Sequence, residues 1–313
     1  MGGAEHNPAG GTTVHPRLGR SLWSDALRRL LRDKAAVVCF AVIVIYALVA
    51  VISPLVLSGW KDSYNYDNIN APPSHSHWLG TDVFGRSVLE KTFLGASTSM
   101  TVGFWSNILA VPLGMILGAV AGYYGGWLDD VIVWLYTTLA SIPGIIRLIA
   151  LKFAFMDHKL LAGTPLEMDL DGLAGLCLAL AVTSWIGTCR LVRAEVMKVR
   201  ELDYVLAARA TGRRGFSILL RHVLPNVLHI GIITFSLGFV GAITSEVILS
   251  YLGLGIKEMP SWGQMIDAAR MDLVVGRWWE LAGAVGAMFF LVLAWNVFGD
   301  RLRDALDPRL KNV

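Results

Sequence analysis

Residues 203–225, DYVLAARATGRRGFSILLRHVLP, form the one long polar insertion between two apolar segments of this chain. Asp203 is placed to cap a short helix that runs to Ala210, and Gly212 is placed to end that helix in a left-handed conformation. A second short helix is expected to end before Pro225. Small side chains let a partner's backbone come close, and the arginines keep the first helix in water or against an acidic surface. We therefore predict a docking helix; an ordinary solvated loop is the alternative.

The spacing of this stretch resembles the cytoplasmic loop of ABC importer permeases, in which Glu-Ala-Ala precedes three residues, a glycine, nine residues and an apolar-x-Leu-Pro ending. Here Leu206 stands at the usual glutamate and His222 at a usual aliphatic position. The sequence around them is most similar to peptide and nickel permeases. The resemblance implies a coupling helix that contacts an ATPase, with these candidate residues: Leu206, Ala207, Ala208, Arg209, Ala210, Gly212, Leu224 and Pro225.

The bulk composition points to a membrane protein with several spans. Of the 313 residues, 55% are hydrophobic and 16% are charged, and the mean hydropathy is +0.56. These values lie outside the range of ordinary soluble domains. A net charge of +3 is too small to indicate a nucleic-acid partner. Three cysteines without paired spacing, Cys39, Cys177 and Cys189, indicate neither a disulfide framework nor a zinc site.

Apolar runs of sufficient length predict six transmembrane helices and an all-α fold. The predicted spans are residues 35–57, 100–123, 131–155, 173–192, 227–251 and 281–299. The docking helix falls between spans four and five. The segment before the first span contains a predicted amphipathic helix over residues 23–32, and it is not a signal peptide, because the apolar run that follows is long enough to span a bilayer and has no small-residue cleavage pattern.

The chain divides into four regions on this reading. They are an N-terminal segment at 1–34, the first span with an external loop at 35–95, the transmembrane core at 96–300 and a C-terminal tail at 301–313. Orientation follows from lysine and arginine, which accumulate on the cytoplasmic side. Eighteen of the 27 basic residues lie before span one, in the segment from Arg190 to Arg221, or after span six. Both termini and the docking helix are therefore expected in the cytoplasm, with the chain in a bacterial inner membrane.

The polar loop between the first two spans contains two possible sites. His75 and His77 supply half of a metal ligand set, but no third ligand stands nearby, so no metal site is predicted. The run HWLGTDVFGRS at 77–87 is similar to a segment of the C-type subunits of peptide importers. Asp82 and Arg86 lie four residues apart within it and are expected to form a local ion pair if the turn is helical.

Two charges within the spans stand out as possible pathway residues. Arg147 follows Pro143, which is expected to kink span three, and the related permeases generally carry an apolar residue there. Glu246 lies in span five at a similar estimated depth. A lone charge in hydrocarbon costs about 2.5 to 3.5 kcal/mol or more. We therefore predict that Arg147 and Glu246 form an ion pair or face one polar cavity; the alternative for Arg147 is that it extends outward to the membrane surface.

Two further runs continue the resemblance, LSYLGLG at 249–255 and GDRLRDALDPR at 299–309, so the matches extend from about residue 34 to 309. No phosphate-binding loop and no catalytic or metal constellation is present, which argues against an enzyme and against a cofactor in this chain. The resemblance implies one permease half of an ABC importer, with these partners: a homologous permease, two cytoplasmic ATPases, an external solute-binding protein and the lipid bilayer.

Two other classes remain open. A secondary transporter would need buried acids near the bilayer midplane and broken helices in repeated halves. A membrane scaffold or receptor without transport is the other alternative, and ATPase activity coupled to transport distinguishes it from a permease. The sequence leaves the cargo open among peptides, nickel chelates and glutathione.

Overall fold

The computed structural model describes residues 22–156, 158–160, 163, 168–256 and 259–306. Within them the chain is helical apart from loops and a pair of two-residue strands, β1 (Lys159–Leu160) and β2 (Met168–Asp169). The helices are α1 (Leu22–Arg32), α2 (Lys34–Val56), α3 (Val88–Tyr124), α4 (Gly126–Ala140), α5 (Gly144–Phe155), α6 (Leu173–Val199), α7 (Asp203–Ala210), α8 (Gly215–Ile218), α9 (Leu224–Tyr251), α10 (Trp262–Val274) and α11 (Trp279–Leu306). The loop before α3 holds two short 3₁₀ turns, Trp60–Asp62 and Tyr66–Asn68, and a π-helical turn, Leu219–Val223, joins α8 to α9.

Five helical stretches in the described part of the chain are long and apolar enough to cross a membrane, and the pair α4 and α5 makes a sixth span if it is counted as one. The all-α fold with six spans is thus confirmed in outline. The third span differs from the prediction of a single kinked helix, because α4 and α5 meet at 91°. Pro143 lies in extended backbone just before α5. Its missing N–H and the crowding of its ring end α4 instead of bending it.

Three spans are longer than hydropathy predicted. α3 begins at Val88, twelve residues before the predicted start, and the Ser87 hydroxyl accepts the N–H of Glu90 at its first turn. The added turns of α3 contain polar residues such as Thr92 and Thr98, which are buried against other helices. α6 and α11 likewise continue past their apolar runs at their C-terminal ends. Hydropathy detects only the part of a helix that meets lipid.

The centre of the bundle is the contact between α3 and α6. Gly114, Gly118 and Gly122 of α3, which are four residues apart in the sequence, lie at this contact. A Cβ atom on Gly114, Gly118 or Gly122 would lie 2.5–2.7 Å from a backbone carbonyl oxygen of α6. A separation this short excludes any side chain larger than hydrogen, so the two backbones pack directly against each other.

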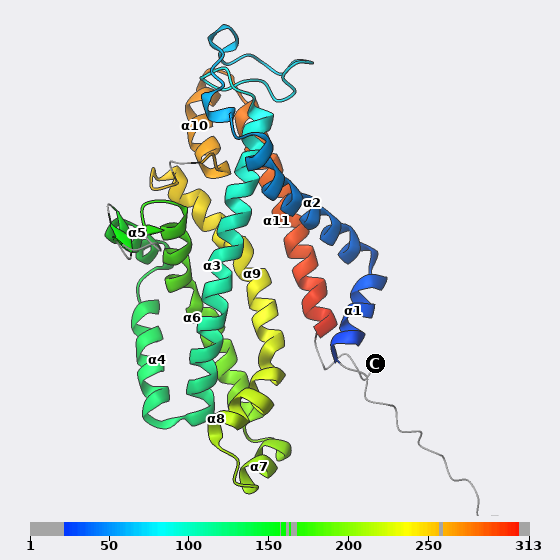
Figure 1. Cartoon of the computed structure of the whole chain (residues 1–313), viewed down its shortest axis with the longest axis vertical. Helices are drawn as coiled ribbons and strands as arrows, with labels where there is room; N and C mark the ends of the chain where they lie inside the picture. The colour runs from blue at the N-terminus through cyan, green and yellow to red at the C-terminus, as the bar shows by residue number, and fades with distance from the viewer. Residues whose placement is uncertain (1–21, 157, 161–162, 164–167, 257–258, 307–313) are drawn as a thin grey trace, which may run out of the picture.

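The two ends of the molecule carry different elements (Figure 1). α7 and α8 project at one end, and α10 lies at the opposite end beside the long loop that precedes α3. α1 contacts α11 and lies away from α10, whereas α11 contacts both α1 and α10. The predicted docking helix therefore lies with α8 at one end of the bundle, opposite to the loop that precedes α3.

Candidate coupling surface

The N-cap of α7 lies one residue earlier than the sequence suggested. Leu202 occupies the N-cap position in extended backbone, and its carbonyl accepts the N–H groups of Val205 and Leu206 at 2.9 and 3.1 Å. Asp203 lies in the first turn and makes no capping hydrogen bond. The prediction that Asp203 caps this helix is wrong. Its carboxylate still favours the helix start, because negative charge in the first turn interacts well with the helix dipole.

One face of α7 packs against the bundle. Val205 is fully buried in a cluster with Ile218, Leu219 and Val223 that also includes side chains of α3 and α6. Ala208, one turn further, packs against the same cluster. Ala208 therefore contacts its own chain, and of the three alanines expected to offer a small-residue face, only Ala207 and Ala210 are exposed.

α7 ends as predicted at Gly212. This glycine has φ of +74°, and its N–H donates to the Arg209 carbonyl at 2.9 Å. The Thr211 hydroxyl donates to the carbonyl of Ala208 at 2.9 Å, which satisfies another free carbonyl of the last turn. A Cβ on Gly212 would meet no atom within 4 Å, so the need for glycine comes from the backbone conformation alone.

The second half of the stretch differs from the prediction. The helix that was expected to end before Pro225 instead continues through the π-helical turn into α9. The N–H of Leu224 donates to Leu219, five residues earlier, and Pro225 lies in the first turn of α9, where its missing N–H leaves no bond unmade. Leu224 packs against the cluster that holds α7. Leu224 and Pro225 thus lie where the predicted docking element continues into the span α9.

The outward face of α7 and α8 is both apolar and cationic. We call the following exposed residues the α7–α8 surface: Leu202, Tyr204, Leu206, Ala207, Ala210 and Phe216. Leu206 is 41% exposed and Phe216 is 64% exposed. Exposed arginines surround this surface: Arg209, Arg213, Arg214 and Arg221. Such a surface suits a partner with an apolar groove and acidic edges.

Two arginines of α6 connect this end of the molecule to other spans. The Arg193 guanidinium donates two hydrogen bonds to the Asp129 carboxylate of α4, at 2.5 and 2.6 Å. Arg200 donates to the carbonyl of Gly122 in α3 at 2.9 Å. Bidentate pairing fixes orientation as well as distance. A displacement of α7, which follows α6 directly, would therefore be transmitted to α3 and α4.

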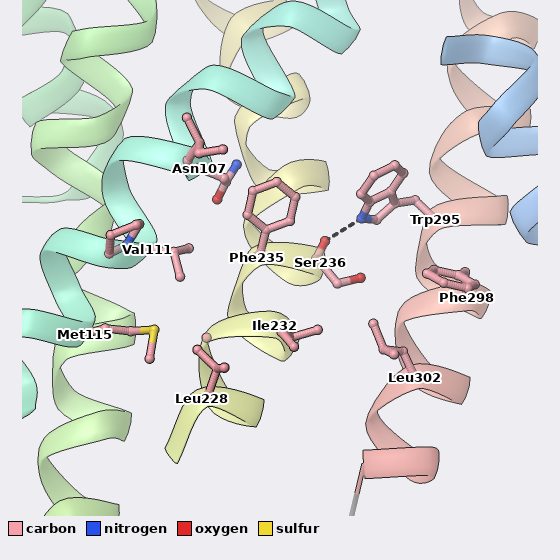
Figure 2. A pocket seen from close by; sticks show the side chains of 13 residues that line it. Asn107, Val111, Met115, Leu228, Ile232, Phe235, Ser236, Trp295, Phe298 and Leu302 are labelled. Carbon is pink, nitrogen blue, oxygen red and sulfur yellow. Dashed lines mark hydrogen bonds between the residues drawn. The ribbon is translucent and has the colours of Figure 1, made fainter. Parts of the chain in front are cut away.

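A pocket of about 440 Å³ lies between α3, α9 and α11 (Figure 2), and its exposed lining is apolar. The indole N–H of Trp295 donates to the Ser236 carbonyl at 2.8 Å and joins α11 to α9 at this level. Phe298 and Leu302 of α11 face Ile232 and Leu228 of α9 across the pocket. The sequence did not single out any of these residues, because their proximity depends on how three separate helices pack.

Arg147 and Glu246 do not form the predicted ion pair. Arg147 donates to the carbonyls of Leu139 and Thr183, so it bridges the end of α4 to α6. Glu246 is fully buried in α9 and accepts the hydroxyl of Ser250 at 2.7 Å. The break after α4 leaves carbonyls without helical donors, and the guanidinium satisfies one of them. Arg147 therefore neither extends outward nor needs a carboxylate partner.

A buried charge cluster lies at the end of the bundle that carries α10, and the sequence predicted only its Asp82–Arg86 pair. Asp82 and Arg86 pair at 2.8 Å as predicted, although their turn is not helical. The Nζ of Lys91 lies 2.5 Å from Glu280 of α11 and 3.6 Å from Asp82. Burial alone would raise the pKa of Asp82, but the hydrogen bonds of Arg86 and the charge of Lys91 outweigh it and hold the pKa below its ordinary value. These contacts hold the loop before α3 against α3 and α11.

The sequence matches the family model described as the binding-protein-dependent transport system inner membrane component over residues 110–312. This chain belongs to that family. Residues 21–73 also match the N-terminal transmembrane domain of oligopeptide transport permease C. The permease is therefore a transport subunit of the inner membrane, of a family that works with a solute-binding protein and ATPase subunits, and it is not itself an enzyme.

Relatives and a solved structure place the permease among ABC importers. A glutathione transport system permease protein of Pectobacterium atrosepticum is 34% identical to it over 94% of this chain and 93% of that protein. A dipeptide transport system permease protein of Bacillus subtilis is 34% identical over 98% and 91%. The inward-facing MetNI methionine ABC transporter matches with a TM-score of 0.50 and 18% identity, over 69% of this chain and 94% of that chain. The fold is that of an ABC importer permease.

Among the described residues, no group of three or more His, Cys, Asp or Glu side chains is arranged to hold a metal ion. His75 and His77 both lie in the loop before α3, outside the spans. The three cysteines are free thiols. Nothing in the described geometry is built for catalysis, and the surfaces that stand out are those at the two ends of the bundle.

Proposed function

We propose that this permease forms one half of the translocation pathway of an ATP-driven importer for peptides or peptide-like solutes such as glutathione. The α7–α8 surface carries this proposal, because an apolar and cationic surface that projects beyond the spans and is rigidly joined to α6 and α9 suits a transmitter of ATPase movement. The names of the relatives, which transport dipeptides, oligopeptides and glutathione, support the cargo class.

The assembly we propose contains a homologous second permease, two cytoplasmic ATPases and an external solute-binding protein, and this chain needs no cofactor of its own. In this assembly both termini and α7 face the cytoplasm, whereas α10 and the loop before α3 face outward. A cysteine introduced at Ser217 is then labelled only from the cytoplasm, and one introduced at Ser74 only from outside. The opposite accessibility would contradict both the orientation and the coupling role.

The coupling role is tested by substitutions on α7. Ala207→Trp places a bulky ring on the exposed face and should prevent ATPase association by steric overlap. Gly212→Val should misdirect the chain after α7, since a left-handed conformation costs a residue with a Cβ about 1 to 2 kcal/mol. Both variants should insert normally in the membrane and fail to retain the ATPases on purification. Wild-type ATPase retention and turnover in both would refute the proposal.

The position of Ala208 provides an internal comparison for that experiment. Ala208→Trp disturbs the cluster around Val205 as well as any partner contact. It should therefore lower the thermal stability of the permease alone, whereas Ala207→Trp should not. If Ala207→Trp loses ATPase binding while its thermal stability is unchanged, the loss comes from the partner contact and not from unfolding of the permease.

A further inference from the structure

A group of cations without acidic partners lies on α1. Arg28, Arg29 and Arg32 are exposed, and within the described part of the chain none of them pairs with a carboxylate. Leu27 and Leu31, one turn apart on the same helix, are 58% and 66% exposed. A helix with both features is stable at a surface that offers negative charge beside hydrocarbon.

The start of α2 places α1 at the membrane surface. Asp33 is the only residue between the two helices, and its carboxylate accepts the N–H of Ala35 at 2.9 Å. α2 is a 23-residue span of mean hydropathy 3.1. Arg301, near the end of α11, lies 3.3 Å from the same carboxylate. α1, the start of α2 and the end of α11 therefore form one fixed corner at the edge of the bilayer.

This corner contains a polar pocket of about 200 Å³ between α1 and α11. Its lining residues are Arg29, Leu30, Asp33, Arg301, Asp304 and Ala305. The Asp33 carboxylate is occupied by the α2 cap and by Arg301, whereas Arg29 has no partner. The two arginines and two aspartates of the lining balance in charge, and the excess of positive charge on the α1 side comes from Arg28 and Arg32 beside the pocket.

The polar pocket and the apolar pocket of Figure 2 are both lined by the C-terminal part of α11. Leu302 lines the apolar pocket, and its chain neighbour Arg301 lines the polar one. Trp295, Phe298, Leu302 and Ala305 follow the three- and four-residue spacing of one helix face. One face of α11 thus leads from an apolar pocket inside the membrane to a charged pocket at its surface, which is the distribution of polarity in a phospholipid.

We propose that this corner binds an anionic phospholipid, with the phosphate group beside Arg29 and Arg32 and an acyl chain in the pocket between α3, α9 and α11. The unpaired arginines favour an anionic headgroup, because each basic residue near a membrane surface contributes about 1 kcal/mol to binding anionic lipid. The apolar pocket distinguishes a lipid from free phosphate. A bound lipid would hold α1 and the end of α11 against α9 and fill the pocket between them.

The test is native mass spectrometry of the complete transporter, titrated with phosphatidylglycerol or phosphatidylcholine. The wild-type complex should retain more phosphatidylglycerol than phosphatidylcholine. Arg29→Gln together with Arg32→Gln should weaken the binding of phosphatidylglycerol roughly 30-fold and leave the binding of phosphatidylcholine unchanged. Leu228→Trp, which fills the apolar pocket, should weaken the binding of both lipids. Inorganic phosphate should not compete.

Two matched controls separate the site from general effects. Arg270→Gln removes an exposed arginine outside this corner, and Leu237→Trp enlarges an exposed leucine of α9 that does not line the pocket. Both should bind lipid as the wild type does. Equal losses in the controls and the site variants would overturn the proposal, and so would wild-type lipid retention in the arginine variant. If Leu228→Trp leaves lipid unchanged but disrupts assembly with the second permease, the pocket is a protein interface and the lipid proposal fails.

Discussion

Replacing Lys91 with methionine should destabilise the α10 end of the permease far more than the loss of one surface charge would. The Lys91 ammonium lies 2.5 Å from a Glu280 carboxylate oxygen and 3.6 Å from Asp82. The side chains of Lys91, Glu280 and Asp82 are 11%, 3% and 0% exposed. Asp82 keeps Arg86 as a partner, but Glu280 is left buried without a cation. Breaking a buried pair in this way costs about 3 to 5 kcal/mol.

Thermal unfolding of the purified permease in detergent measures this effect against two comparisons. Lys198→Met removes a lysine that is 70% exposed and pairs with Glu195 at the other end, and it should cost about 0.5 kcal/mol or less. A double variant with methionine at both Lys91 and Glu280 should regain most of the loss, because apolar pairs replace buried ion pairs well. Equal effects of the two lysine substitutions, or a double variant no better than Lys91→Met, would refute the reasoning.

Three further predictions concern single contacts. The losses of unfolding free energy caused by Arg147→Leu and Glu246→Leu should be additive within about 0.5 kcal/mol in a double-mutant cycle, because the two side chains share no partner. A larger coupling energy would indicate that the two side chains do form an ion pair. Gly118→Ala should lower the unfolding temperature, whereas Gly187→Ala, with nothing within 4 Å, should not. Because the pKa of Asp82 lies below its ordinary 3.8, its stabilisation is present above about pH 4 and is lost as the pH falls through the folded pKa. Hydrogen exchange of the loop before α3 should therefore be protected to the same extent at pH 7 and pH 5 and lose protection only in stronger acid.

The parts of the fold that depend on local chemistry were predictable from the sequence. Apolar runs in the sequence located every span. Gly212 adopts the left-handed conformation that its place after a short helix predicted. Each of these features depends on a few neighbouring residues, so a single sequence contains enough information to find them.

The parts that depend on contacts between distant segments were not predictable. The pairing of Lys91 with Glu280 joins residues 189 positions apart. Arg147 was expected to need an acid, but the break between α4 and α5 supplied a carbonyl instead. Ala208 turned out to pack inward because the position of α7 is set by α8 and α9. Side-chain direction on a short helix follows from its neighbours, which hydropathy does not describe.

The pocket between α3, α9 and α11 is a further example of the same limit. Its lining residues belong to three spans, and each of them reads in the sequence as an ordinary membrane-facing side chain. Only the arrangement of the helices shows that Leu302 lies at the junction of an apolar pocket and a charged one.

Uptake of a labelled peptide into proteoliposomes that contain this permease together with the proposed second permease and the two proposed ATPases tests the central claim most directly. We predict accumulation that requires both ATP and the solute-binding protein and that stops when this chain is omitted or carries Ala207→Trp. Accumulation driven by a proton or sodium gradient without the ATPases would instead identify a secondary transporter. Peptide binding without any accumulation would identify a receptor, and either result would contradict the account.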